Sequence, residues 1–282
     1  MKATNIFKDK NFIKCLRYNT FDDNNNYIKI FNDKDEIIEK NIDKIIKIDC
    51  SGYWITNIKG ISIFRNLRIL NLSNNKIKKI SNEIGKLTNL EELYLCGNRL
   101  QSLPNKLSNL KNLKILNLFN NQIKKISKEI WNLSNLKKLD LSYNQIKELS
   151  NEIEKLINLE ELDLKYNQIK ELPSEIGKLE KLKMLYLNWN QLQYLPEEIL
   201  KFDKLRQIWL YDAFDLNNLK QDPKELLYIL QKLEEKKDIL STIDLEYLKE
   251  IYLILIKKIK KKYKVDNLKQ IKDNLNLDNL NF

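Results

Sequence analysis

The chain has 282 residues, 43% of them hydrophobic, and its 50 basic and 39 acidic side chains give a formal net charge of +11. This length and apolar content suffice for a folded core in one large domain or two ordinary ones. Histidine is absent and the five glycines occur singly, which excludes histidine-based nucleophiles, the common zinc ligand sets and glycine-rich phosphate loops. We therefore expect a protein that is not an enzyme, with no catalytic residues, no metal site and no cofactor.

The three cysteines, Cys15, Cys50 and Cys96, share no spacing. An odd and scattered set argues against a secreted disulfide scaffold and indicates a reducing compartment. Residues 1–20 lack the continuous apolar stretch of a signal peptide. The longest apolar run, 251–256, is far shorter than the roughly 20 residues of a membrane-spanning helix. We therefore expect an intracellular, cytoplasmic protein without a membrane span.

The first 43 residues carry only short structural signals. Residues 27–31 favour a strand, and residues 35–44 favour a short helix that includes Ile37 and Ile42. The segment that follows has the apolar spacing of the repeat described below but lacks the asparagine of that repeat, so it predicts a degenerate first turn. Its apolar residues are Ile46, Ile48, Ile55, Ile58, Ile61 and Phe64.

One phrase, L-x-x-L-x-L-x-x-N-x-L, then recurs every 23 residues. Its six copies follow one another without insertion or deletion as far as about Asp203. A seventh copy starts at Leu205, but Ala213 stands where the asparagine is expected, so the repeat ends there. The six regular copies begin at Leu67, Leu90, Leu113, Leu136, Leu159 and Leu182.

This phrase resembles that of the leucine-rich repeat proteins, in particular the 23-residue L-P-x-x-I-x-x-L-x-x-L type of intracellular scaffold and bacterial proteins. The resemblance covers about 44–216 and implies an α/β solenoid, a horseshoe with parallel strands on its concave side. The residues alone lead to a similar structure. In Leu93-Tyr94-Leu95 the side chains alternate between two faces, as in a strand. A single strand of this kind can bury its inner face and pair its backbone only by stacking on the next copy.

The segment after each strand begins with an asparagine, and we predict that these side chains bond backbone groups of their own and neighbouring turns. This structural ladder consists of Asn75, Asn98, Asn121, Asn144, Asn167 and Asn190. Ser or Pro with Glu two residues later, as at Ser81 and Glu83, predicts a short helical turn on the convex side. A second set of asparagines should end this turn in the left-handed conformation. These are Asn66, Asn89, Asn112, Asn135 and Asn158.

Helical periodicity takes over near the C-terminus. Asp222-Pro223 predicts the start of one helix, and a second follows Ser241, with Asp244 at the capping-box position. The second helix ends in the basic run 257–264, which we interpret as cations near a helix C-terminus. The expected organisation is an N-terminal cap region over 1–43, the solenoid over 44–216, and a helical C-terminal cap or extension over 217–282.

The register of the repeat also predicts which side chains face outward on the concave side. Large aromatic residues concentrate on the later turns, and adjacent strands lie about 4.8 Å apart, so Tyr143, Tyr166 and Trp189 should stand side by side. Asp140 and Asp163 add negative charge and indicate a partner that presents Lys or Arg. The candidate partner-binding residues are Tyr94, Phe119, Asp140, Tyr143, Asp163, Tyr166, Tyr186, Trp189, Trp209 and Tyr211. Alternatively, these rings stack on one another or lie under the C-terminal helices, and bind nothing.

These patterns predict a non-catalytic protein–protein interaction module that binds another protein on its concave face. The alternative is binding to nucleic acid or to an anionic membrane through the basic run 257–264 and a stripe of lysines. Acidic and neutral residues interrupt this stripe, so nucleic acid is the disfavoured partner. The stripe consists of Lys78, Lys79, Lys124, Lys125, Lys147 and Lys170. The sequence defines neither the identity of the partner nor an oligomeric state.

Overall fold

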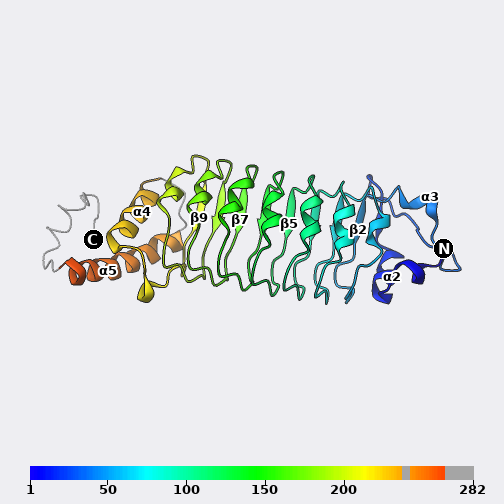
Figure 1. The fold of residues 1–282 in the computed structure, drawn as a ribbon, viewed down its shortest axis with the longest axis horizontal. Helices are drawn as coiled ribbons and strands as arrows, with labels where there is room; N and C mark the ends of the chain where they lie inside the picture. The colour runs from blue at the N-terminus through cyan, green and yellow to red at the C-terminus, as the bar shows by residue number, and fades with distance from the viewer. Residues whose placement is uncertain (237–241, 264–282) are drawn as a thin grey trace.

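The structure is a computed structural model, which describes residues 1–236 and 242–263 (Figure 1). Within these residues, nine strands form one sheet in sequential order. The first pair, β1 and β2, is antiparallel, and every later pair is parallel. The strands are β1 (Thr20–Phe21), β2 (Lys47–Asp49), β3 (Ile69–Asn71), β4 (Glu92–Tyr94), β5 (Ile115–Asn117), β6 (Lys138–Asp140), β7 (Glu161–Asp163), β8 (Met184–Tyr186) and β9 (Gln207–Trp209).

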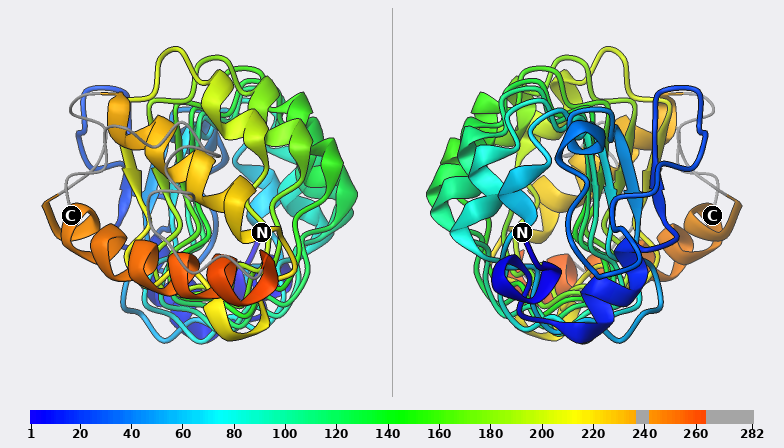
Figure 2. Two further views of the ribbon diagram at one scale, coloured as in Figure 1. Left: turned by 90° about the vertical axis from the view of Figure 1, so that its left-hand side faces the viewer. Right: turned by 90° about the vertical axis from the view of Figure 1, so that its right-hand side faces the viewer.

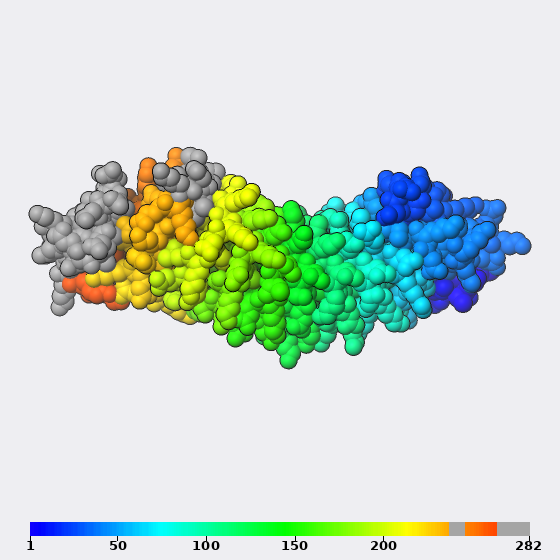
Figure 3. All heavy atoms as spheres, turned by 90° about the horizontal axis from the view of Figure 1, so that it is seen from above, coloured from blue at the N-terminus to red at the C-terminus, as the bar shows by residue number. Residues whose placement is uncertain are grey.

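A short 3₁₀ turn follows each strand from β2 onward, and the turns after β2 to β8 lie on the side of the molecule opposite the sheet (Figure 2). Seen from above, the molecule bends, with its middle displaced to one side of both ends (Figure 3). The predicted solenoid with parallel strands and short helical turns is thereby confirmed. The 3₁₀ turns are η1 (Ile61–Ile63), η2 (Asn82–Lys86), η3 (Asn105–Asn109), η4 (Lys128–Asn132), η5 (Asn151–Lys155), η6 (Ser174–Lys178), η7 (Glu197–Lys201) and η8 (Leu216–Asn218).

The repeat length sets the register of the sheet. Leu70 pairs with Leu93, which pairs with Leu116, and each step advances by one 23-residue copy. The two leucines that flank each outward residue, such as Leu93 and Leu95, are fully buried. They pack against the apolar residues of the 3₁₀ turns in one continuous core. Each turn therefore buries its apolar face only against its neighbours, as expected for a solenoid.

The asparagines that follow the strands bond backbone groups of two successive turns. The Asn144 side chain donates from Nδ2 to the carbonyl oxygens of Leu118 at 3.0 Å and Leu141 at 3.0 Å. Its Oδ1 accepts a hydrogen bond from the Ile123 N–H at 2.9 Å. The other five members of the ladder make equivalent bonds, which satisfy polar groups of the loops that would otherwise be buried without partners.

The second set of asparagines behaves differently from the prediction. None has a positive φ, so the expected left-handed conformation is wrong. Their side chains instead donate to a carbonyl oxygen of the preceding turn, as Asn135 does to Lys111 at 2.8 Å. The left-handed residues follow the strands instead, in the column Asn74, Gly97, Asn120, Tyr143, Tyr166, Trp189 and Asp212.

Three short helices and β1 cover the N-terminal end of the sheet. The helices are α1 (Ala3–Ile6), α2 (Lys10–Leu16) and α3 (Glu39–Ile42). Asp9 caps α2 through the N–H groups of Asn11 and Phe12, and its other oxygen accepts from the Thr56 N–H and hydroxyl, both at 2.7 Å. The strand predicted over 27–31 is wrong, because this segment makes only isolated bridges at Tyr27 and Phe31.

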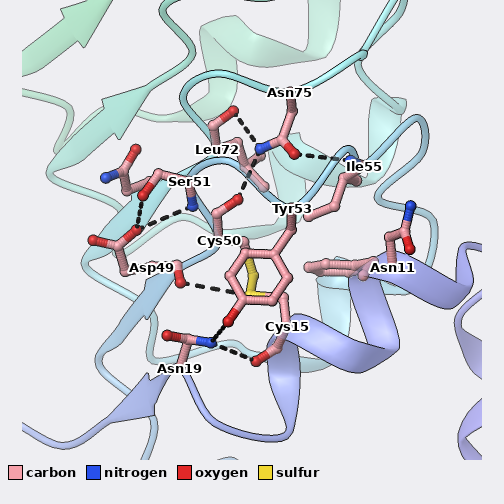
Figure 4. Close-up of a disulfide and its surroundings, with 12 residues drawn as sticks. Asn11, Cys15, Asn19, Asp49, Cys50, Ser51, Tyr53, Ile55, Leu72 and Asn75 are labelled. Carbon is pink, nitrogen blue, oxygen red and sulfur yellow. Dashed lines mark hydrogen bonds between the residues drawn. A yellow bond between two sulfur atoms is a disulfide. The ribbon is translucent and has the colours of Figure 1, made fainter.

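A disulfide joins Cys15 of α2 to Cys50, which follows β2 (Figure 4). This bond does not fit the reducing compartment that the odd cysteine count indicated. The sequence does not reveal the pairing, because the two residues belong to different elements and share no motif. It closes a loop between positions 35 residues apart and ties the N-terminal helices to the first parallel strand. Asn19 contributes nearby by donating hydrogen bonds to the Cys15 carbonyl oxygen and the Tyr53 hydroxyl.

Two helices close the opposite end, α4 (Pro223–Glu235) and α5 (Thr242–Tyr263). Asp222 caps α4 by accepting from the Lys224 N–H at 2.8 Å, as its sequence predicts. In the end-on view, α4 lies across the last turn of the solenoid and α5 runs beside it (Figure 2). Ser241 and the Asp244 side chain, which form the predicted capping box, lie outside the described residues. None of the described helices combines the length and apolarity needed to cross a membrane.

Candidate partner-binding surface

Five of the predicted binding residues form one continuous row of rings, which we call the aromatic ladder. Its members are Phe119, Tyr143, Tyr166, Trp189 and Tyr211. Tyr143 and Tyr166 stack with centroids 4.1 Å apart, and Tyr166 and Trp189 stack at 5.3 Å. The end rings meet their neighbours edge-on, Phe119 at 5.1 Å from Tyr143 and Tyr211 at 5.3 Å from Trp189. The three central rings occupy equivalent repeat positions, which the constant register of the sheet brings side by side, and the two end rings come from the position just before it.

The three central rings remain accessible although they stack on one another. Tyr143 is 40% exposed, and Tyr166 and Trp189 are each 37% exposed. The C-terminal helices do not cover them. Among the described residues, α5 reaches the ladder at Tyr247, whose ring lies 5.4 Å from that of Tyr211. The alternative interpretation held that the rings stack on one another or lie under the C-terminal helices. The rings do stack on one another, yet the three central ones stay partly exposed.

The backbone of these three residues is unusual for aromatic side chains. Tyr143, Tyr166 and Trp189 have φ angles of 54°, 53° and 57°, in the left-handed region. Asn74 and Asn120 occupy the same column, and Gly97 stands between them. Asparagine and glycine tolerate this conformation, whereas a bulky residue there costs about 1 kcal/mol or more. The repeat therefore places its largest rings where its own pattern offers less strained choices.

The remaining aromatic candidates lie beside the ladder or apart from it. Tyr186 and Trp209, on neighbouring strands, stack at 6.2 Å, and the Lys165 ammonium lies 5.6 Å from the Tyr186 ring centroid. Tyr94 does not join the ladder, because it lies on β4 in the mid-strand column, where its neighbour on β5 is Asn117. Its hydroxyl donates to Glu92 at 2.7 Å. Burial, together with this hydrogen bond, raises the pKa of Tyr94 to about 12.

Asp140 and Asp163 stand opposite each other on β6 and β7, as the register requires. Both carboxylates already have partners within the sheet. Asp140 accepts from the Ser142 N–H and hydroxyl, and Asp163 pairs with the Lys165 ammonium at 3.0 Å. Burial raises the pKa of Asp163 despite these bonds from Lys165. The two residues therefore offer a partner less negative charge than the sequence suggests.

One further column of side chains faces outward and was not among the predicted ones. Residues two positions before the predicted mid-strand column share its face, since side chains in a strand alternate with period two. They include charged pairs, such as Lys138 and Glu161 at 2.8 Å. Applying the same alternation one step earlier would have found this column. It consists of Ile69, Glu92, Ile115, Lys138, Glu161, Met184 and Gln207.

The basic surfaces are dispersed in the structure. In the run 257–264, Ile259 is buried and Lys262 pairs with Asp222 at 2.7 Å, while Lys264 lies outside the described residues. In the lysine stripe, Lys125 lies 3.5 Å from the Glu148 carboxylate.

Within the part of the chain that the structure describes, no group of three or more Cys, Asp or Glu side chains could hold a metal ion.

Comparison with known protein families gives the same assignment as the geometry. A family profile described as a leucine-rich repeat region matches residues 116–279. A second profile, described as leucine rich repeat, matches residues 45–100 and 65–123. The chain belongs to the leucine-rich repeat family. Proteins of this family are generally non-catalytic scaffolds, and the family supports a role in protein–protein interaction. No curated protein sequence matches the chain.

Solved structures of leucine-rich repeat proteins are similar to this chain over part of their length. One from Leptospira interrogans is 34% identical, with a TM-score of 0.56 over 64% of this chain and 50% of that protein. The ectodomain of the Arabidopsis thaliana membrane receptor kinase GASSHO1/SCHENGEN3 was solved in complex with CASPARIAN STRIP INTEGRITY FACTOR 2. It is 32% identical, with a TM-score of 0.52 over 56% of this chain and 20% of that protein. Internalin C2 of Listeria monocytogenes, at 22% identity, shares the fold, with a TM-score of 0.54 over 73% of this chain and 94% of that protein. The matched segments thus span half or less of the first two proteins.

Proposed function

We propose that this leucine-rich repeat chain is a non-catalytic module that binds a protein partner through the aromatic ladder on its concave side. The observation that carries the proposal is the row of partly exposed rings at left-handed backbone positions. Folding alone favours asparagine or glycine there. Residues held at such a cost cluster at active sites, ligand-binding sites and switch regions.

The chemistry of the ladder suits a protein surface. Tyr and Trp dominate the energetics of protein interfaces because they bury a large area with few rotatable bonds. The faces of Tyr143, Tyr166 and Trp189 are largely occupied by stacking, so the ladder presents ring edges and polar tips to solvent. Ring edges carry partial positive charge and pack well against apolar side chains and carbonyl oxygens. Apolar side chains and carbonyl oxygens are both abundant on a polypeptide.

The stacking also prepares the ladder for binding. Each central ring is held by neighbours on both sides, so its side chain loses little conformational freedom when a partner docks. Pre-organisation of this kind raises affinity by lowering the entropic cost of association. Tyr186 and Trp209 extend the aromatic area on the adjoining strands.

The test replaces the three central rings by the residue that the repeat itself uses in this column. The variant Tyr143→Asn/Tyr166→Asn/Trp189→Asn should fold, because Asn74 and Asn120 adopt the same conformation. Loss of the stacking contacts is offset by relief of backbone strain, so we expect a melting temperature within a few degrees of wild type. A matched control is Tyr194→Asn, which removes an aromatic ring of similar exposure, 38%, outside the ladder.

The assay is affinity capture from the source organism with wild type, the triple variant and the control as baits, followed by titration with the purified partner. We expect capture by wild type and the control, and a loss of at least a hundredfold in affinity for the triple variant. Equal affinity of the folded triple variant would refute the ladder as the binding site.

A further inference from the structure

Trp54 stands at the N-terminal end of the edge that carries the aromatic ladder. It follows β2 and is 63% exposed. The Lys76 ammonium lies over its ring, 3.7 Å from the centroid. Two depressions flank it. One, of about 350 Å³, is lined by Trp54, Lys76 and Arg99, and the other, of about 470 Å³, by Trp54 and Lys14.

The charge around Trp54 has one sign. Lys14, Lys76 and Arg99 line the two depressions, and no acidic side chain lines either. None of these three cations forms an ion pair with a carboxylate among the residues that the structure describes. Elsewhere the surface charges are commonly matched, as in the cluster of Arg68, Glu91 and Lys114. The Trp54 region is therefore an unneutralised basic site with an aromatic centre.

This basic site is continuous with the aromatic ladder. Asn74, Gly97 and Asn120 line the depression beside Arg99, and they belong to the left-handed column. The next member of that column is Tyr143, the first of the three central rings of the ladder. A ligand that extends along this edge would thus leave the cations and meet the rings without a break.

We propose that the protein partner binds through an extended segment, with acidic side chains over Trp54, Lys76 and Arg99 and apolar side chains over the aromatic ladder. The inference rests on the proposed function and specifies the chemistry of the partner. A carboxylate can pair with Arg99 in two hydrogen bonds and with the Lys76 ammonium above the Trp54 ring. The acidic end of the segment lies toward the N-terminal turns of the solenoid.

The column beside the ladder favours a peptide over a nucleic acid. After Lys76 and Arg99 the equivalent positions carry neutral amides, namely Gln122, Gln145, Gln168 and Gln191. A phosphate backbone needs cations along its whole length, and here they stop after two turns. Side-chain amides offer both a donor and an acceptor, which match the N–H and C=O groups of an extended peptide.

The strand spacing sets the layout of the segment. Arg99 belongs to the turn after β4 and Tyr143 to the turn after β6, so about 10 Å separates them at about 4.8 Å per strand. An extended peptide advances about 3.3 Å per residue. Side chains of an extended segment alternate between two faces, so the acidic and apolar positions of the bound segment should be two or four residues apart.

The experiment selects peptides from a phage-displayed library of random nonapeptides on the full chain. Peptides that also bind the folded triple variant Tyr143→Asn/Tyr166→Asn/Trp189→Asn are discarded. We expect the survivors to combine Asp or Glu with aromatic or aliphatic residues two or four positions away. One selected peptide is then titrated by fluorescence anisotropy, with a single-stranded dT20 oligonucleotide as the competing probe.

Two variants with the same change in net charge separate a local site from general attraction. Lys76→Ala/Arg99→Ala should weaken peptide binding about tenfold, and binding should weaken as salt increases. Lys78→Ala/Lys79→Ala removes exposed lysines of a neighbouring segment and should leave the affinity unchanged.

Four results would overturn the inference. They are ladder-dependent peptides without acidic residues, equal affinities of the two double variants, unchanged affinity of Lys76→Ala/Arg99→Ala, and binding of the oligonucleotide through Lys76 and Arg99 in place of an acidic peptide. The first three leave the proposed function intact. Recovery of no ladder-dependent peptide would count against both proposals.

Discussion

The structural asparagines give the most direct test of how this solenoid is held together. Asn144 bonds three carbonyl oxygens and one N–H group, and two of these four bonds reach the preceding turn. One of the three oxygens, that of Ser142, also accepts from the Asn120 N–H and keeps that partner when Asn144 is replaced. Asn144→Ala keeps a small side chain at the site and removes all of these bonds. The backbone groups of Leu118, Leu141 and Ile123 then remain buried without partners.

The size of the effect follows from the number of groups left unpaired. A buried backbone group without a hydrogen bond costs about 1–3 kcal/mol, so three such groups sum to about 3–9 kcal/mol. Entry of water into the space left by the amide recovers part of this cost. We expect Asn144→Ala to lower the free energy of unfolding by about 4 kcal/mol. Asn135→Ala, which removes one exposed hydrogen bond to the Lys111 carbonyl, should lower it by less than about 1 kcal/mol.

The assay is urea unfolding followed by circular dichroism, with the two alanine variants compared with wild type at one temperature. Because repeats can unfold in parts, the midpoint and the slope are compared together. A loss below about 1 kcal/mol for Asn144→Ala would refute the reasoning, since it would mean that these bonds can be exchanged for water at little cost. Equal losses in the two variants would point instead to helix or loop propensity.

Two further predictions concern the N-terminal cap. Reducing the disulfide, or replacing Cys15 and Cys50 by serine, should lower the free energy of unfolding by about 4 kcal/mol, because the bond closes a loop between positions 35 residues apart. Chemical denaturation with and without dithiothreitol measures this loss, and Cys96→Ser is the matched control. Identical unfolding midpoints with and without the bond would contradict the prediction. Burial opposes ionisation of Asp9, but hydrogen bonds from Thr56 and nearby backbone groups outweigh it and lower the pKa of Asp9. Its stabilising contribution is therefore complete above the carboxylate pKa of the unfolded chain and is lost as pH falls through the lower folded value. Asp9→Asn should flatten the acid side of the stability curve measured by thermal melts from about pH 6 to pH 2, whereas parallel curves would show that the carboxylate contributes nothing.

Much of the fold could be predicted because each repeat meets the same surroundings. The 23-residue period places Leu70 against Leu93 and Leu93 against Leu116, so one register defines strands, core and turns together. The same logic predicts that Tyr143, Tyr166 and Trp189 become neighbours, and the ring distances agree. Whether these rings bind a partner stays a prediction.

Several features depend on contacts that the period does not describe. The sequence does not indicate that Tyr143 takes a left-handed backbone, because asparagine adopts this conformation more readily and Asn66 and Asn89 were predicted to take it. Asp163 looked available to a partner until Lys165 was placed beside it. Tyr247 lies outside the repeat, so its contact with Tyr211 required the position of α5.

The sequence by itself determined the solenoid, its register and its outward columns, since a fixed period repeats one local environment and stacking is the only way to bury its apolar face. Tertiary structure alone decided the pairing of Cys15 with Cys50 and the position of Lys76 over Trp54. Those contacts join segments outside the regular repeat or across it. No spacing along the chain reports a distance that depends on how two such segments pack.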